Sequence, residues 1–248
     1  MEALRVERES DLLRVTMARP ERRNAFDAEL IRELTEAFTD VPEDVRAVLL
    51  AGEGKSFSAG ADVDWMRSSV ELSYEENVAD ARRLRKMLET MDACPAPLIA
   101  RVHGHALGGG CGLVACCDIV VSAPDALFAF SEVKLGIIPA VISPFALAKI
   151  GPSAARRYFV TGERFDAATA LRIGLVHEVA EDLDGAVAAI ISELRTAGPE
   201  AARHGKKLVL ERPDGLGTER RIAQRRTSEE GQEGLRAFLE KRQPGWSS

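Results

Sequence analysis

The middle of the chain contains the glycine-rich stretch that decides the fold, LIARVHGHALGGGCG at residues 98–112. Residues 98–102 are typical of a buried strand, and the glycines at 108–110 precede an apolar segment that runs to Cys117. Glycine lets the backbone turn sharply and lets a ligand approach it closely. Free N–H groups at the start of the next helix favour negative charge. The strand–GxGxxG–helix order of a dinucleotide-binding loop is not met.

A second loop with the same character precedes this stretch in the chain. Residues 58–62, Ser-Ala-Gly-Ala-Asp, follow a predicted buried strand at 45–51. Two such loops could supply two converging N–H donors, which is what an oxyanion hole requires. Each loop taken alone is more typical of a plain turn.

The rest of the chain predicts an α/β core followed by helices. Alternating apolar residues predict strands at 3–8 and 12–17, and Asp27 can cap the helix that follows them. A long helix is predicted from Tyr74 to Met91. The further elements that we expect are strands at 118–122 and 127–130, a loop at 131–144, and helices over 144–242 with one short strand at 175–179.

Composition limits the classes of protein to which the chain could belong. Its 248 residues are 46% apolar and carry a formal net charge of −6, so the basic excess of a nucleic-acid binder is missing. The four cysteines fit no zinc spacing and are expected to be reduced and buried. No signal peptide or membrane span is evident, and we expect a cytoplasmic protein.

Glu132 is the acidic residue best placed to carry a proton. It follows the apolar strand at 127–130, and apolar surroundings raise the pKa of a carboxyl group, which suits acid–base work. Pairing with Lys134 or exposure to water is the alternative. His103 and His105 flank Gly104, but no third ligand for a metal accompanies them, so a structural role is expected.

Several motifs together resemble the crotonase (enoyl-CoA hydratase/isomerase) superfamily, in order and at the family's spacing over residues 5–242. They are Phe57–Val63 and His105–Cys111, which resemble the two oxyanion loops, then Cys117–Val120, Ser131–Pro139, Thr161–Glu163 and Ala170–Val176. The resemblance implies a spiral of ββα units at residues 1–190. It also implies a C-terminal helical oligomerisation region at 191–248 that builds homotrimers or hexamers.

The resemblance also implies the chemistry. The backbone N–H groups of Ala61 and Gly109 would hold the thioester oxygen of an acyl-CoA, and Glu132 would move the proton. Coenzyme A would enter as part of the substrate, with no separate cofactor, no metal, no nucleic acid and no membrane as partner.

The residues that the resemblance places against the substrate or its CoA part form a longer set. They are Arg22, Arg23, Ala25, Ala59, Gly60, Asp62, Val63, Leu107, Gly108, Gly112, Pro139, Ala140 and Lys241. Of these, Arg22, Arg23 and Lys241 are expected near the CoA phosphates and Ala59 near the adenine.

Two departures from the family pattern bear on the reaction. Gly112 stands where two-glutamate hydratases carry their other glutamate, and the missing side chain is expected to leave room for a methyl branch at C3 of the substrate. Ala140 stands where a glycine commonly follows the proline, and its N–H is expected to remain available to water or substrate.

Finer resemblance favours a hydratase that acts on 3-methylglutaconyl-CoA in leucine breakdown, although isohexenylglutaconyl-CoA hydratases share parts of the pattern. The group that would pair with a distal substrate carboxylate is open, with Arg67, Arg82 and Lys134 as candidates. An enoyl-CoA isomerase that uses Glu132 alone is the next alternative. A CoA- or RNA-binding protein without catalysis is the last.

Overall fold

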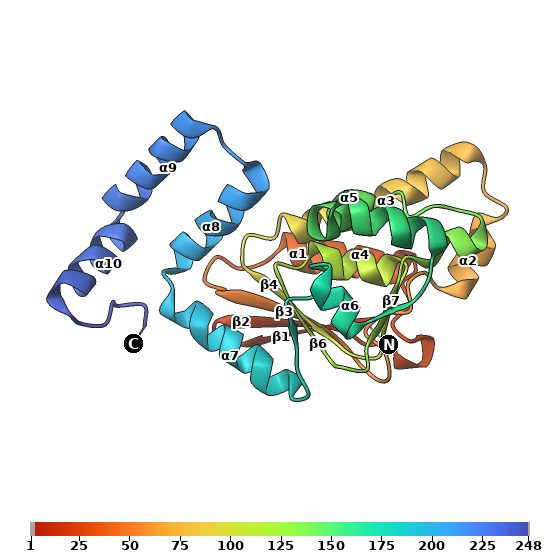
Figure 1. Ribbon diagram of the computed structural model, residues 1–248, viewed down its shortest axis with the longest axis horizontal. Coiled ribbons are helices and arrows are strands. Elements are labelled where there is room, and N and C mark those ends of the chain that lie inside the picture. The colour runs from red at the N-terminus through yellow and green to blue at the C-terminus, as the bar shows by residue number, and fades with distance from the viewer. Residues whose placement is uncertain (1–2, 248) are drawn as a thin grey trace.

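A computed structural model describes residues 3–247 as a sheet covered by helices, with a helical arm at one end (Figure 1). The main sheet has six strands in the order β1-β2-β3-β4-β6-β9, and all neighbours are parallel except β1 and β2. Its strands are β1 (Leu4–Glu9), β2 (Leu12–Met17), β3 (Ala47–Gly52), β4 (Leu98–Val102), β6 (Ile119–Ser122) and β9 (Glu178–Val179).

A second, smaller sheet gives the fold its repeating ββα character. It consists of β5 (His105–Leu107), β7 (Leu127–Ala129) and β8 (Phe165–Asp166), in the order β5-β7-β8. Strands β4 and β5 are followed by α4 (Gly109–Cys116), and β6 and β7 lead through the 3-10 helix η2 (Ser131–Leu135) to α5 (Ser143–Thr161). Each unit therefore adds one strand to each sheet and one helix beside them.

Strand residues alternate between two hydrophobic clusters, which is why both faces of the main sheet are covered. Val48 and Leu50 belong to the large core, under α1 (Ala28–Thr39), α3 (Tyr74–Asp92) and α4. Leu49 points the other way into a smaller cluster with Leu183 and Val187 of α7 (Leu183–Thr196). Figure 1 shows α7 on the opposite side of the sheet from α1, α3 and α4.

Local sequence signals fix the ends of the helices that form the site. The Asp27 side chain accepts hydrogen bonds from the backbone N–H groups of Glu29 and Leu30 and caps α1, as predicted. Ser73 and Glu76 form a capping box at the start of α3. Three short helices of the core are η1 (Pro20–Arg22), α2 (Val63–Ser69) and α6 (Ala167–Arg172).

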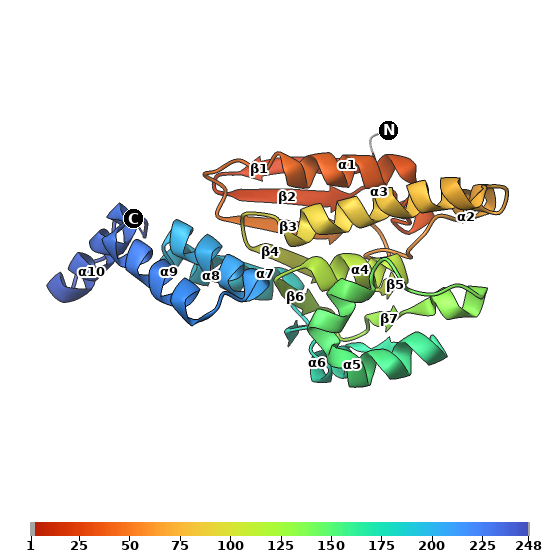
Figure 2. The same ribbon diagram turned by 90° about the horizontal axis from the view of Figure 1, so that it is seen from above.

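Three helices form an arm that extends beyond the end of the sheet (Figure 2). They are α8 (Pro199–Glu211), α9 (Gly215–Thr227) and α10 (Glu229–Glu240). The arm is tied to the core where Lys206 Nζ lies 2.7 Å from Asp118 Oδ2, and where Arg46 Nη1 donates to the carbonyl of Trp246 at 3.0 Å. None of the helices in the described part of the chain is both long and apolar enough to cross a lipid bilayer.

Most predicted elements are present, and the differences are short. The loop predicted at 58–62 is followed by the short helix α2, and β5 and β8 were not predicted because they have only three and two residues. Residues 131–135, predicted as loop, form η2. All four cysteines are free and buried, as expected.

Candidate active site

The two glycine-containing loops lie against each other along their backbones. Phe57 N donates to the carbonyl of His103 at 2.9 Å, and Ser58 N donates to that of His105 at 2.9 Å. Leu107 N returns a bond of 3.0 Å to the carbonyl of Ser58. This ladder brings residues 58–62 beside the start of α4, although about fifty residues separate the two loops in sequence.

Phe26 connects a third segment to the first loop. Its N–H donates to the carbonyl of Gly60 at 2.8 Å, and its carbonyl accepts from Asp62 N at 3.0 Å. These two bonds bracket Ala61 and fix its peptide plane. The N–H of Ala61 itself donates to no backbone acceptor within residues 3–247.

Glycines allow the close approach of the loops. Gly60 and Gly108 have φ angles of 88° and 52°, in the left-handed region that side chains disfavour. A Cβ atom on Gly60 would lie 2.6 Å from the carbonyl oxygen of Leu107 and 3.5 Å from Gly109 N. A Cβ atom on Gly109 would lie 2.1 Å from Cζ of Phe26. The Phe26 ring therefore packs directly on the backbone of the second loop.

The result is a pair of adjacent donors without acceptors. Gly109 is the first residue of α4, so its N–H has no partner within the helix, and the described residues supply none from elsewhere. The N–H groups of Gly109 and Ala61 belong to loops in direct contact, which makes them candidates for the two donors of an oxyanion hole. Such a donor typically contributes about 3–4 kcal/mol to the stabilisation of an oxyanion.

Glu132 lies beside this pair of donors on η2. Its Oε1 is 3.5 Å from the position of a Cβ atom on Gly108, and its Oε2 is buried without a hydrogen-bond partner. Burial raises the pKa of the Glu132 carboxyl above its ordinary value, and the backbone N–H of Glu132 itself lowers it by a smaller amount. The side chain is thus placed to exchange a proton near the two donors, and the alternative of pairing with Lys134 is not what the structure shows.

A cavity of about 370 Å³ opens over these groups. Helices α2 and α3 form one wall, and the segment from Ser131 to Ile142 forms the other. Its described lining consists of Phe26, Ala59, Gly60, Ala61, Trp65, Met66, Ser69, Asn77, Asp80, Ala81, Leu84, Gly108, Gly109, Ser131, Glu132, Leu135, Ile137, Ile138, Pro139, Ala140, Val141 and Ile142. This mostly apolar lining suits an acyl chain.

The structure brings eight of the residues predicted from the sequence together at this cavity. They are Ala59, Gly60, Ala61, Gly108, Gly109, Glu132, Pro139 and Ala140. The other predicted residues do not line it. They are Arg22, Arg23, Ala25, Asp62, Val63, Leu107, Gly112 and Lys241.

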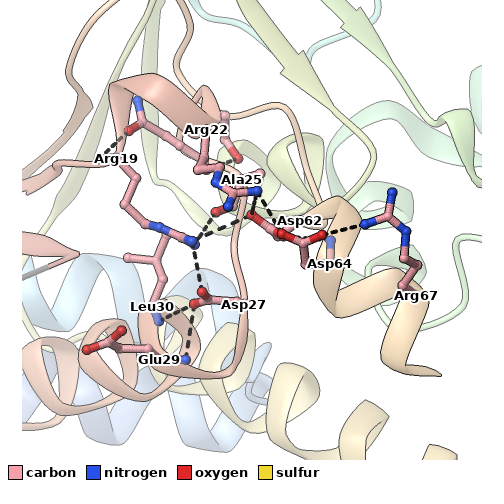
Figure 3. Close-up of polar contacts among 11 residues, drawn as sticks. Arg19, Arg22, Ala25, Asp27, Glu29, Leu30, Asp62, Asp64 and Arg67 are labelled. Carbon is pink, nitrogen blue, oxygen red and sulfur yellow. Dashed lines mark hydrogen bonds and ion pairs between the residues drawn. The ribbon is translucent and has the colours of Figure 1, made fainter. Parts of the chain in front are cut away.

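Asp62 and Arg22 belong instead to a network of charges under the first loop, shown in Figure 3. Asp62 is almost completely buried, caps α2 by accepting from Asp64 N at 2.8 Å, and pairs with Arg19 at 3.5 Å. Arg22 pairs with Asp64 at 2.9 Å, and Arg19 pairs with Asp27 at 2.9 Å. These residues hold the loop in place, and Arg22 is already engaged by carboxylates.

Arg23 is the exposed cation that remains close to the first loop. Its carbonyl accepts from Ala59 N at 2.9 Å, and no acidic partner is recorded for its side chain in the described structure. Lys241 ends α10 in the arm, which lies at the opposite end of the molecule from α2 (Figure 1). Within the single chain, Lys241 therefore lies away from the cavity, and its expected role near the CoA phosphates stays a prediction.

Two expectations about the reaction centre are corrected. A Cβ atom on Gly112 would lie 2.5 Å from Cγ2 of Ile142, so that side chain fills the space expected to accommodate a methyl branch. The N–H of Ala140 donates to the carbonyl of Ile138 at 2.8 Å and is not available to water or substrate. Both errors arise because the segment 137–142 folds over the cavity, which no local pattern reveals.

Several lining residues were not found from the sequence. Asn77, Asp80, Ala81 and Leu84 lie on one face of α3, a helix that the sequence predicts without a role at the site. His103 and His105 do not line the cavity; they contact the carbonyl of Gly54 and the hydroxyl of Ser56. Within residues 3–247, no group of three or more His, Cys, Asp or Glu side chains is close enough to hold a metal ion.

A sequence model of the enoyl-CoA hydratase/isomerase family matches residues 7–248. The chain belongs to this family. Within the family it is 33% identical to the crotonyl-CoA hydratase of Syntrophomonas wolfei over 258 aligned residues, which cover 98% of this chain and 97% of that protein.

Solved structures of family members agree over the whole chain. An enoyl-CoA hydratase from Shewanella pealeana is 41% identical with a TM-score of 0.92, covering 98% of this chain and 96% of that one. The Pseudomonas aeruginosa protein AtuE is 36% identical with a TM-score of 0.96, and each chain is covered completely. The chain is thus an enoyl-CoA hydratase/isomerase family enzyme, and the predicted crotonase-like α/β fold is confirmed.

Proposed function

We propose that this enzyme adds water reversibly to a 2,3-enoyl-CoA and that Glu132 alone carries the proton. One observation supports the proposal most strongly. The buried carboxylate oxygen of Glu132 has no partner, and it lies in the same cavity as the two N–H groups that lack acceptors.

The site residues can perform each step of the addition. The N–H groups of Ala61 and Gly109 bind the thioester oxygen and draw electrons from the double bond, so C3 becomes electrophilic. Glu132 accepts a proton from a water molecule while the water oxygen forms a bond to C3. The negative charge moves to the thioester oxygen as an enolate. Glu132 then returns the proton to C2, which gives a 3-hydroxyacyl-CoA.

An enoyl-CoA isomerase is the second candidate, and one observation favours it. Ile142 fills the space beside Gly112, so no carboxylate can activate water from that position. A single Glu132 could instead take a proton from one carbon of the substrate and return it to another. Incubation with a 3-enoyl-CoA separates the two reactions, because an isomerase yields the conjugated thioester without a hydroxylated product.

The decisive assay for the proposal uses the isosteric variant Glu132→Gln. Hydration of a 2-enoyl-CoA, followed as loss of the conjugated thioester, should fall by at least about a hundredfold. Binding of a saturated acyl-CoA, measured by calorimetry, should be retained. Persistent turnover in Glu132→Gln would assign the proton transfer to another group, and absence of turnover in the wild type would favour the non-catalytic CoA-binding alternative.

The acyl group is a separate question. The sequence resemblance favours 3-methylglutaconyl-CoA, and a longer isohexenylglutaconyl chain is its alternative. Both carry a distal carboxylate, which needs a cationic or hydrogen-bond-donating partner when it is buried. Of the candidates for that role, Arg67 pairs with Asp64, and neither Arg82 nor Lys134 lines the cavity. The described lining therefore argues against these two substrates.

We also propose that the arm forms an interface between copies of the chain, as a homotrimer or a hexamer. Large apolar side chains of the arm are exposed in the single chain. They are Leu208, Val209, Leu210, Leu216, Ile222, Leu235, Phe238 and Leu239. Burial of this much apolar surface against a second copy would stabilise an oligomer.

A further inference from the structure

One wall of the cavity changes from apolar to polar along helix α3. Leu84 packs against the hydrophobic core, and Ala81 follows it towards the N-terminus of the helix. Asp80 and Asn77 come next on the same face, and Ser69 at the end of α2 also lines the cavity. We refer to Ser69, Asn77 and Asp80 as the polar wall.

The polar wall presents only hydrogen-bond acceptors. The amide nitrogen of Asn77 donates to the carbonyls of Leu72 and Ser73, each at 3.0 Å, so its Oδ1 remains. The hydroxyl of Ser69 donates to the carbonyl of Met66 at 2.7 Å, so its lone pairs remain. The two carbonyl partners fix the orientation of the Asn77 amide, because its oxygen could not bind them.

Asp80 adds a negative charge to these acceptors. Its side chain is only 13% exposed, and its Oδ1 accepts from Arg83 Nη2 at 2.8 Å. The Arg83 side chain is 61% exposed and does not line the cavity. No hydrogen bond to Oδ2 of Asp80 is recorded within the described structure, so this oxygen can accept one from a ligand.

No positive side chain offsets Asp80 inside the cavity. Among residues 3–247, none of the lining residues is Arg, Lys or His. A carboxylate on the acyl tail would therefore meet Asp80, whose cationic partner Arg83 does not line the cavity, with no positive lining residue to bind it. A hydroxyl group on the tail would instead donate a hydrogen bond to the polar wall.

We propose that the polar wall makes the enzyme select enoyl-CoA substrates with uncharged acyl tails, that it favours tails carrying a hydroxyl group, and that it rejects tails ending in a carboxylate. Asp80 is the residue that sets this specificity. The inference rests on the proposed function in one respect, since the cavity must receive the acyl group of a CoA thioester.

Three substrates of equal chain length test the selectivity: 2-hexenoyl-CoA, 6-hydroxy-2-hexenoyl-CoA and the monothioester 2-hexenedioyl-CoA. In the wild type, kcat/KM for the carboxylated substrate should lie at least about tenfold below that for 2-hexenoyl-CoA, because like charges meet. The hydroxylated substrate should have a higher kcat/KM than 2-hexenoyl-CoA, and a value that is no higher would overturn the preference for a hydroxyl group.

The variant Asp80→Asn removes the charge and keeps the shape of the side chain. Asp80→Asn should reduce the difference in kcat/KM between the neutral and the carboxylated substrates. The matched control is Glu75→Gln, which removes a charge from the same helix at an exposed position that does not line the cavity. That control should leave the order of the three substrates unchanged.

Calorimetry with the saturated analogues hexanoyl-CoA, 6-hydroxyhexanoyl-CoA and adipoyl-CoA separates this inference from the reaction itself. If no substrate is hydrated but adipoyl-CoA still binds most weakly, the proposed function is wrong and the selectivity is supported. If hydration proceeds and the carboxylated ligands bind and react as well as the neutral ones, the selectivity is overturned. The same conclusion follows if Asp80→Asn leaves the ratio of neutral to carboxylated kcat/KM at its wild-type value.

Discussion

Glu132 is half-buried, and its Oε2 atom is buried without a hydrogen-bond partner, which has a consequence for stability that is independent of catalysis. Its pKa is raised in the folded protein by desolvation, whereas the unfolded chain ionises near the ordinary value of 4.5. The folded state therefore holds its proton to higher pH than the unfolded state. The stability that the protonated form contributes is lost as pH rises through the raised pKa.

Replacement of Glu132 by glutamine should remove this pH dependence. The Tm of Glu132→Gln minus that of the wild type should be small near pH 4 and should become more positive towards about pH 7. Thermal unfolding followed by circular dichroism at several pH values measures the difference. The control Glu75→Gln alters an exposed side chain, so the difference between its Tm and that of the wild type should change much less with pH. If the Tm of Glu132→Gln minus that of the wild type becomes smaller as pH rises, the Glu132 carboxylate is not desolvated.

The contact between Gly109 and Phe26 leads to a second prediction, which concerns turnover when a side chain is added at position 109. In Gly109→Ala the added Cβ would overlap Cζ of Phe26, so the ring or the start of α4 must shift. Because the Gly109 N–H moves with the helix, kcat/KM should fall by at least about tenfold. Gly205→Ala, where a Cβ atom meets nothing within 4 Å, should leave turnover unchanged.

A double substitution distinguishes steric displacement from general damage. Phe26→Leu removes the atom that clashes, so Gly109→Ala combined with Phe26→Leu should recover part of the activity lost in Gly109→Ala alone. Equal losses in the single and double variants would show that the Phe26 ring does not determine where the second loop lies.

Short elements and tertiary contacts mark the limit of what the sequence could predict. The Asp27 cap of α1 and the long helix α3 carry strong local signals and were predicted. Strand β5 has three residues inside a glycine-rich stretch, so its pairing with β7 depends on contacts distant in sequence. The convergence of the two loops of the site was predicted from the sequence. The ion pairs of the charged residues beside the first loop, such as Arg19 with Asp62, were not predicted.

The first loop depends on η1 and the residues that flank it. Arg19 is mostly buried and pairs with Asp27 and with the buried Asp62, which directly follows Ala61. Its Nη1 also donates to the carbonyl of Ala25 at 2.7 Å. The charge network therefore connects the cap of α1, the cap of α2 and the oxyanion loop.

Removal of Arg19 should destabilise the protein because it leaves Asp62 buried with too little positive charge. Arg19→Met is expected to lower the free energy of unfolding by about 3 kcal/mol, measured by urea denaturation. Arg19→Met combined with Asp62→Asn removes both charges and should recover part of that loss. If the double variant is less stable than Arg19→Met, the pair of charges is not what the loop requires.

At the scale of the whole molecule, the proposed oligomerisation depends on the apolar surface of the arm. Phe238 and Leu239 of α10 are 81% and 78% exposed in the single chain. The resemblance to the crotonase superfamily predicts an oligomerisation region at residues 191–248, which includes these two side chains. Local sequence patterns do not indicate how many copies of the chain such an assembly would contain.

Charges on this surface should disrupt the oligomer. Phe238→Asp combined with Leu239→Asp is expected to shift the protein to a smaller species, measured by size-exclusion chromatography with light scattering. Arg236→Ala, an exposed position on the same helix, should keep the wild-type mass. A wild type that is monomeric at micromolar concentration, or a double variant with unchanged mass, would contradict the proposed interface.

The most direct test of the whole account is a crystal structure of Glu132→Gln with a bound, unreacted 2-enoyl-CoA. The account predicts that the thioester oxygen accepts from both Ala61 N and Gly109 N at about 2.7–3.2 Å, with the substituted side chain at position 132 beside C2 and C3. A thioester oxygen bound by other groups, or a side chain at position 132 remote from the double bond, would contradict it.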